Sequence, residues 1–385
     1  MTSKEIMAAA MNLEKPERVP VMCQMANGHT IINTGVHPID YFVDNEVWAD
    51  CLIRMRELYD FDGILCHKPG RVPGIMDLVE RTDYDMETPS LFMKDGSRIE
   101  CTRDDDAYYK EADSGMERPT IDDLDLDDML GWAPESFVAF QASKATFPVS
   151  DPDGFDDATF GMIDKVIERV GGEFSVHGEV RAPMDHFLNI LGLESGMMAI
   201  FDDTGKVPQM MDRLTEWSIA LAVAQVRRGA DAIKVSSPFV GGGFLGLEDY
   251  EKYVLPFESR LAKAVRDEGR PIYTHTCGAI GDRLNLLCQA GVSGIECLDP
   301  PPLGNVEIEA AVEELNGKIF IKGNVDPVCT LLQGDREKVT EDVTRILEAT
   351  RDMSGFILSS ACSVAPPAPP ENMQLMVELA HEFAA

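Results

Sequence analysis

The chain of 385 residues carries 67 acidic residues against 34 lysines and arginines, so its formal net charge at pH 7 is −33. Such a charge argues against DNA, RNA and anionic membrane surfaces as partners, and it is typical either of a very soluble protein or of one with an acidic face for a basic partner. Hydrophobic residues make up 44% of the chain, enough for a large core, yet no run approaches the length of a membrane-spanning helix.

The first 20 residues contain acids and lack the apolar centre of a secretion signal, so we expect a cytoplasmic protein. The nine cysteines are scattered along the chain. In the cytoplasm they are expected to be free thiols or metal ligands rather than a disulfide framework.

Short apolar or β-branched runs alternate with longer helical stretches, which indicates a parallel sheet in an α/β fold. Eight such repeats over this length predict a (β/α)8 barrel, the TIM barrel, as a single domain over residues 1–385. The helical stretches include residues 247–269 and 335–353. The expected strands are 18–24, 61–67, 173–180, 231–238, 271–277, 293–299, 319–326 and 355–363.

Residues 80–160 interrupt this alternation and are rich in aspartate and proline. We expect them to form an acidic insertion after the second strand, which would cap the mouth of the barrel. Within it, residues 91–101 predict a hairpin that turns at Asp95 and Gly96, because Asp-Gly favours the backbone conformation of a tight hairpin turn.

His275, Cys277 and Cys362 come at the carboxyl ends of the fifth and eighth predicted strands. A strand points the side chains of His275 and Cys277 to the same face, and Gly278 supplies the turn that follows. In a TIM barrel the carboxyl ends of all strands meet at one mouth, where active sites are built. One imidazole and two thiolates suit zinc, and three protein ligands leave a fourth position for a substrate or water.

A purely structural interpretation also fits these residues, because cysteines are among the most buried residue types and the chain has no CxxC pair. We assign the other cysteines to packing: Cys23, Cys51, Cys66, Cys101, Cys288, Cys297 and Cys329.

Three segments resemble the uroporphyrinogen decarboxylase superfamily: the opening MTSKEIMAAAMNLEKPERVPV, the later IKGNVDPVCTLLQGDREKV and the closing CSVAPPAPPENMQLMVELAHEF. The resemblance runs over nearly the whole chain. One branch of the superfamily, the corrinoid-dependent methyltransferases, carries a His-x-Cys pair and a distant cysteine that bind zinc. His275, Cys277 and Cys362 match that pattern, so the resemblance implies that these three residues bind zinc.

The resemblance further implies a methyltransferase that moves a methyl group between a corrinoid on a separate protein and a small acceptor, such as a thiol or tetrahydrofolate. Demethylation of a methoxylated or methylated compound onto the corrinoid protein is the alternative within this branch. Uroporphyrinogen decarboxylase is another, but that enzyme grips its substrate with an arginine-rich N-terminal loop, and here no arginine lies between Arg18 and Arg54. A barrel that binds without catalysing is the remaining interpretation.

Further candidate residues end the third and seventh predicted strands. Glu179 is a candidate for the fourth zinc position or for acid–base catalysis, or it is a carboxylate paired with Arg181. His177 lies on the same face and is a candidate substrate-binding residue or a packed histidine. Asn324 is a substrate-binding candidate through the resembling GNVDP segment, in which Asp326 either lines the pocket or caps the following helix.

Overall fold

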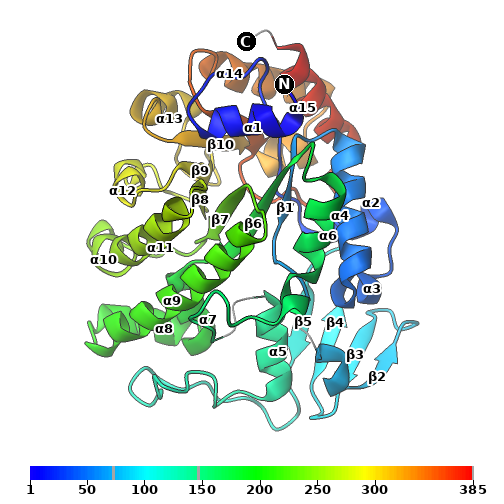
Figure 1. Ribbon diagram of the computed structural model, residues 1–385, viewed down its shortest axis with the longest axis vertical. Coiled ribbons are helices and arrows are strands. Elements are labelled where there is room, and N and C mark those ends of the chain that lie inside the picture. The colour runs from blue at the N-terminus through cyan, green and yellow to red at the C-terminus, as the bar shows by residue number, and fades with distance from the viewer. Residues whose placement is uncertain (72–73, 145–147, 384–385) are drawn as a thin grey trace.

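The computed structural model describes residues 1–71, 74–144 and 148–383. A curled parallel sheet in the order β1-β6-β7-β8-β9-β10-β11 forms its centre, with helices around it (Figure 1). These strands are almost entirely buried because both faces are covered, which explains their apolar, β-branched sequences. Their bounds are β1 (Gly63–Cys66), β6 (Ser175–Arg181), β7 (Ala232–Ser236), β8 (Ile272–Thr276), β9 (Gly294–Cys297), β10 (Phe320–Val325) and β11 (Phe356–Ser360).

The helices confirm the alternation expected from the sequence, with one difference. The predicted helix over 247–269 is two helices that meet at Val254, because Pro256 has no N–H for the helical ladder. The helices are α1 (Ser3–Met11), α2 (Asn27–Thr34), α3 (Pro38–Val43), α4 (Asn45–Tyr59), α5 (Glu135–Lys144), α6 (Gly161–Val170), α7 (Pro183–Leu191), α8 (Leu193–Phe201), α9 (Lys206–Arg227), α10 (Leu247–Tyr253), α11 (Leu255–Asp267), α12 (Leu284–Gln289), α13 (Ile308–Leu315), α14 (Arg336–Ala349) and α15 (Pro370–Glu382), with the short η1 (Ile75–Leu78), η2 (Asp157–Phe160) and η3 (Pro327–Leu332).

Seven of the eight predicted strands are present, and the prediction of a regular strand at 18–24 is wrong. This segment makes only isolated bridges to the β11 side, such as Val21 with Leu358. Its pairing is limited because Pro20 has no N–H and the Val21 N–H is bound by the Asp62 carboxylate, 2.9 Å away. The Val21 carbonyl still accepts from the Asp62 N–H at 2.9 Å, so the segment bonds to both edges of the sheet.

Helix α1 covers the amino-terminal end of the sheet. Its Met7 and Ala10 pack in one cluster with side chains from inside the sheet, among them Tyr273 and Phe320. The helix starts with a capping box, in which the Thr2 side chain accepts from the backbone of Glu5 and the Glu5 carboxylate accepts from that of Thr2. The amino end is therefore filled by apolar side chains, which leaves the carboxyl end for chemistry.

A separate antiparallel sheet follows β1 and lies at the lower right in Figure 1. Its strands are β2 (Val79–Asp83), β3 (Ser90–Met93), β4 (Arg98–Cys101) and β5 (Ala107–Lys110). The predicted hairpin at 91–101 is confirmed: β3 pairs with β4, and Gly96 has φ +86°. The 104–105 loop lies so close to α2 that a Cβ on Gly28 would be 2.3 Å from the Asp104 backbone.

The predicted insertion at 80–160 contains this sheet and α5, and its residues 145–147 lie outside the described residues. Its limits and its role as a cap stay predictions. No helix in the described part of the chain is long and apolar enough to cross a membrane.

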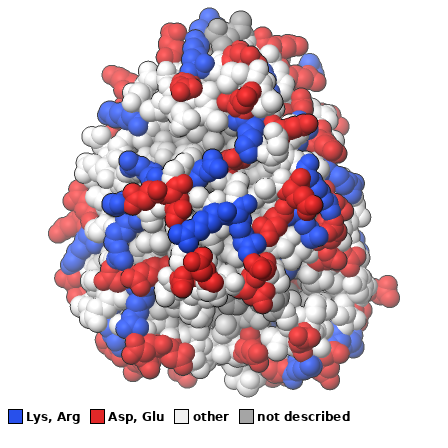
Figure 2. Space-filling model, in the orientation of Figure 1, with Lys and Arg blue, Asp and Glu red and all other residues white. Residues whose placement is uncertain are grey.

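Acidic residues are spread over the visible face and are interspersed with lysines and arginines (Figure 2). Arg228 pairs with Asp157 and Asp164, and Arg227 pairs with Asp153 and Glu268. Exposed pairs of this kind each contribute little to stability. On this face the charge is therefore dispersed rather than gathered into one acidic patch.

Candidate metal centre

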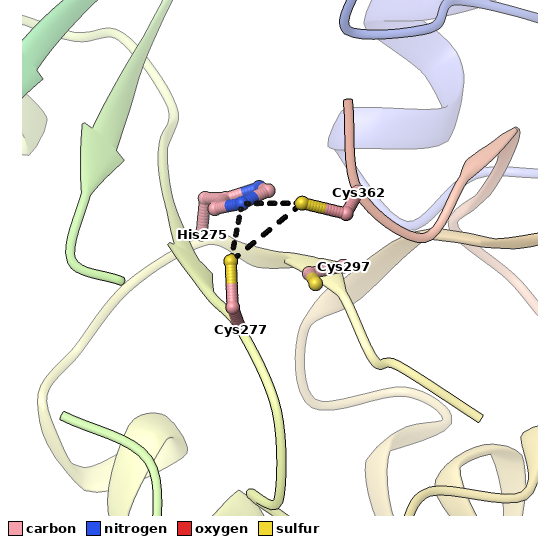
Figure 3. A group of neighbouring side chains, drawn as sticks. All are labelled: His275, Cys277, Cys297 and Cys362. Atoms are coloured by element: carbon pink, nitrogen blue, oxygen red, sulfur yellow. Dashed lines mark hydrogen bonds between the residues drawn. The ribbon is translucent and has the colours of Figure 1, made fainter. Parts of the chain in front are cut away.

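A cluster of one histidine and three cysteines lies at the carboxyl end of the parallel sheet (Figure 3). His275 Nε2 lies 3.2 Å from Cys277 Sγ and 3.9 Å from Cys362 Sγ, and the two sulfurs are 3.7 Å apart. Cys297 Sγ joins them, and all four donor atoms lie within 4.8 Å of one another. The structure thus brings together the three residues that the sequence predicted and adds a fourth.

The local backbone explains how residues so far apart in sequence meet. His275 stands near the end of β8, and Gly278 turns the chain away with φ +77°, as its place after the strand predicted. Cys362 follows β11, and Cys297 is the last residue of β9. Because β8 pairs with β9 and the sheet is parallel, these carboxyl ends converge.

Buried charged side chains fix the orientation of the His275 imidazole. Its Nδ1–H donates to Glu296 Oε2 at 2.9 Å, which leaves Nε2 facing the sulfurs. Glu296 is in turn bonded to Lys322 and lies 3.4 Å from Lys234, and both lysines are fully buried. Burial alone would raise the pKa of Glu296, but the two lysines hold it well below its ordinary value. The ionised carboxylate therefore fixes the orientation of the imidazole.

The surroundings of the Cys362 sulfur favour the thiolate, whereas burial raises the pKa of the Cys297 thiol well above its ordinary value. Hydrogen bonds with Cys277 and Cys297 lower the pKa of the Cys362 thiol, against the effect of burial. Burial acts to lower the pKa of His275, yet its bonds to Cys277 and Cys362 raise it well above its ordinary value. Negative charge on sulfur is the state in which cysteine binds metals.

This donor set fits zinc. Zinc takes tetrahedral nitrogen and sulfur ligands, and thiolates with imidazole are among its usual combinations. The nearby carboxylate of Glu296 is occupied by lysines and the imidazole, so sulfur and nitrogen are the donors that remain. A hard cation such as Mg²⁺ would need oxygen ligands.

A cleft of about 460 Å³ opens beside this cluster. Ser236, in register with His275, and Ser363, next to Cys362, both line it. Its other lining residues are Gln24, Met25, Ala26, Asn27, His67, Lys68, Asp105, Asp106, Glu179, Arg181, Asp185, Pro238 and Phe239. The cleft is therefore a polar chamber near the cluster, although none of the four cluster residues is among its lining residues.

Glu179 lies in the cleft wall, outside the four-residue cluster. Its Oε2 is 3.1 Å from His67 Nδ1 and 3.2 Å from Lys234 Nζ. Burial would raise the pKa of Glu179, but Lys234 and His67 lower it to about 2. At neutral pH Glu179 is therefore a fixed negative charge and not a proton donor.

The structure separates the remaining predicted residues from the cleft. His177 is fully buried and bonded to Ser175 Oγ and Tyr273 OH, each at 3.0 Å, and burial lowers its pKa to about 3. Asn324 donates to the Leu298 carbonyl at 3.0 Å. Neither residue is among the cleft-lining residues, and their substrate-binding roles stay predictions. Asp326 caps η3.

Cys297 as a member of the cluster and Lys322 as part of its support were not predicted from the sequence. Cys297 was assigned to packing, although it ends a predicted strand. A lysine inside an apolar strand, as at Lys322 in IFIKGNV, was a usable signal because lysine is almost never fully buried without a partner.

The sequence model of the uroporphyrinogen decarboxylase (URO-D) family matches residues 141–383. The chain belongs to this family. It is 30% identical over 216 residues to the methylcobamide:CoM methyltransferase MtbA of Methanosarcina acetivorans, over 56% of this chain and 60% of that one. It is 32% identical over 232 residues to the uroporphyrinogen decarboxylase of Syntrophotalea carbinolica, over 60% of this chain and 59% of that one.

The match thus spans about 60% of the length of these relatives, and they include both a corrinoid-linked methyltransferase and a decarboxylase. A methyltransferase from Methanosarcina mazei has a similar structure, with a TM-score of 0.73 and 19% identity over 100% of both chains. This likeness shows the shared fold. Within the family, the resemblance to the corrinoid-dependent branch is confirmed.

Proposed function

We propose that this family member is a zinc-dependent methyltransferase that moves a methyl group between a corrinoid on a partner protein and a small acceptor, such as a thiol. The observation that carries the proposal is the convergence of His275 Nε2, Cys277 Sγ and Cys362 Sγ beside the cleft. The relatives named methylcobamide:CoM methyltransferase support the methyl donor.

Different residues of the chain would bind the metal and the substrate. Zinc, when bound, supplies the Lewis acidity that deprotonates a coordinated thiol at neutral pH. Glu296 keeps the His275 Nε2 lone pair available by accepting from Nδ1. The cleft has room for a small acceptor and is lined by the hydroxyls of Ser236 and Ser363, whereas the Gln24 amide already binds Lys234 and Ser363.

The charges of the cleft argue against uroporphyrinogen decarboxylation. A substrate with many carboxylates needs several cations that are free to bind it. Arg181 and Lys68 are the arginine and the lysine among the described residues that line this cleft, and Arg181 already pairs with Asp185 at 3.2 Å. Asp105, Asp106 and Glu179 add negative charge to the same walls.

Methyl transfer from free methylcobalamin tests the proposal without the partner protein. Purified, zinc-loaded protein is mixed with methylcobalamin and, in separate reactions, coenzyme M, 2-mercaptoethanol or tetrahydrofolate. We expect the absorbance of the methylated corrinoid to fall with at least one acceptor. We also expect about one zinc per chain.

Two further reactions give the contrary outcomes. A cobalt(I) corrinoid that gains a methyl group from a methoxylated compound or a methylated amine, with no acceptor methylated, would support the demethylating direction instead. Turnover of uroporphyrinogen by metal-free protein would overturn the proposal. Cys288→Ala serves as the control variant, since Cys288 is half-buried like Cys277 and Cys362 but lies on α12 outside the cluster.

A further inference from the structure

We propose that Cys297 is a fourth protein ligand of the metal, so that the chain alone supplies one histidine and three cysteines. The inference rests on the proposed function only for the presence of zinc. Its first support is distance, since Cys297 Sγ lies with the other three donor atoms inside a 4.8 Å group. Its second support is the backbone that brings the sulfur there.

Regular strand geometry would point Cys297 away from the cluster. Successive side chains on a strand alternate between faces, and Glu296 already faces inward to His275 and Lys322. Cys297 nevertheless also reaches the cluster, because its φ is +92° and that of Leu298 is +59°. Of these two adjacent residues of β9, Glu296 therefore binds His275 and Cys297 reaches the sulfurs.

This conformation is costly for residues that have a Cβ. A non-glycine residue in the left-handed region costs on the order of 1–3 kcal/mol and persists only where the surroundings enforce it. Here two contacts enforce it: Asn324 Nδ2 donates to the Leu298 carbonyl at 3.0 Å, and the Gly278 N–H donates to Asp299 Oδ2 at 2.7 Å. The turn after β9 is thus tied to β10 on one side and to the His275 strand on the other.

Cys66 shows what a cysteine in the same position does without such a turn. Like Cys297, it is the last residue of a four-residue strand of the same sheet and is fully buried. Cys66 belongs to no group of metal-binding side chains among the described residues, and it packs in the main apolar core. Burial at a strand end therefore does not by itself explain where Cys297 points.

With Cys297 as a ligand, the chain would supply all four donors of a tetrahedral zinc site, and an acceptor thiol would have to replace one of them. The sulfur count of the bound metal tests the inference directly. Zinc X-ray absorption of the wild-type protein, with no thiol added, should be fitted by three sulfurs at about 2.3 Å and one nitrogen at about 2.0–2.1 Å.

The variants give matched comparisons. In Cys297→Ala the sulfur count should fall to two and the zinc dissociation constant should rise at least about tenfold, measured by competition with a chelator. In Cys66→Ala both should stay at the wild-type values. Cobalt-substituted protein provides a second readout, since thiolate-to-cobalt absorbance should drop by about one third in Cys297→Ala alone.

The two proposals fail in different ways. Wild-type protein that holds zinc through only two sulfurs, or a Cys297→Ala variant with an unchanged sulfur count and affinity, would overturn the role of Cys297. Wild-type protein that binds no zinc would overturn the proposed function itself. The wild-type measurement stands even if the Cys297→Ala variant does not fold.

Discussion

The two halves of the carboxyl end of the sheet carry different chemistry. On the β8, β9 and β11 side, the donor atoms of one imidazole and three thiols lie within 4.8 Å of one another. On the β1, β6 and β7 side, Glu179 is held between His67 and Lys234. Lys234 also reaches Glu296, so the halves are joined by charge. Because Glu179 and Glu296 are each paired with a lysine, the nitrogen and sulfur donors of the sulfur half are the ones that suit a borderline-soft ion.

The largest effect should come from breaking the sulfur half. Cys277→Ala and Cys362→Ala each remove a donor that contacts His275. Even residues that only orient a metal ligand typically contribute 10–100-fold, so we expect these variants to lose at least about 100-fold in zinc affinity and in methyl transfer. Metal analysis and the methylcobalamin reaction measure the two losses.

Normal zinc content in either variant would show that the cysteines on the β8, β9 and β11 side do not bind the metal. Circular dichroism distinguishes a specific loss of zinc from a loss caused by misfolding. The Cys288→Ala variant should match the wild type in both measurements, because its thiol lies on α12 away from the cluster.

The second largest effect should be on the pH dependence of stability. It comes from a buried carboxylate that has no cation paired with it in the described part of the chain, unlike Glu179 and Glu296. Glu258 on α11 accepts from Ser237 Oγ at 2.6 Å, and its other oxygen has no hydrogen-bond partner among the described residues. Burial raises the pKa of Glu258 from 4.5 to about 7. The folded state then holds the proton more tightly than the unfolded state, so this group makes stability fall as the pH rises from 4.5 to about 7.

Glu258→Gln should remove that loss. The variant should gain little at pH 5 and up to about 3 kcal/mol in the free energy of unfolding above pH 7, the energy of a shift of this size. Urea unfolding at several pH values measures it, with the exposed Glu251→Gln as the control. A gain that does not depend on pH would mean that Glu258 is not protonated in the folded protein near pH 5.

A third, smaller effect tests the charged half. Glu179→Gln should keep its zinc but lose about tenfold in methyl transfer, equivalent to about 1.4 kcal/mol, because the cleft loses a fixed charge. Since the pKa of Glu179 is about 2, the wild-type activity should show no titration of this group between pH 5 and pH 9. Loss of zinc in this variant would instead place Glu179 at the metal, as the sequence allowed.

Much of the fold could be predicted because its signals are local. Apolar runs separated by helices mark buried parallel strands wherever they occur, and seven of eight were present. The segment 18–24 failed because the Asp62 side chain takes the Val21 N–H. That competition depends on a residue 41 positions away and leaves no trace in the segment itself.

The candidate site was predictable only in part, because strand periodicity gives the face of a side chain and not its depth. His177 and Glu179 do share a face, but His177 bonds to Tyr273 in the interior while Glu179 lines the cleft. Cys297 was assigned to packing because cysteines are often buried, and strand periodicity could not have corrected this, since it holds only while φ stays negative. The two positive φ values that turn Cys297 inward arise from contacts with other strands.

The smallest effect should come from substituting Asp326. This residue directly follows β10, two positions after Asn324, but it stabilises the fold by capping η3. Its carboxylate accepts from the N–H groups of Val328 at 2.7 Å and Cys329 at 2.8 Å. Asp326→Ala should therefore lower the free energy of unfolding by about 1 kcal/mol with unchanged zinc content and methyl transfer, and Asp326→Asn, which can still cap, should restore most of the stability. A loss of methyl transfer without a loss of stability would instead show that Asp326 acts in the cleft. The charged residues of the site would then include one that follows β10.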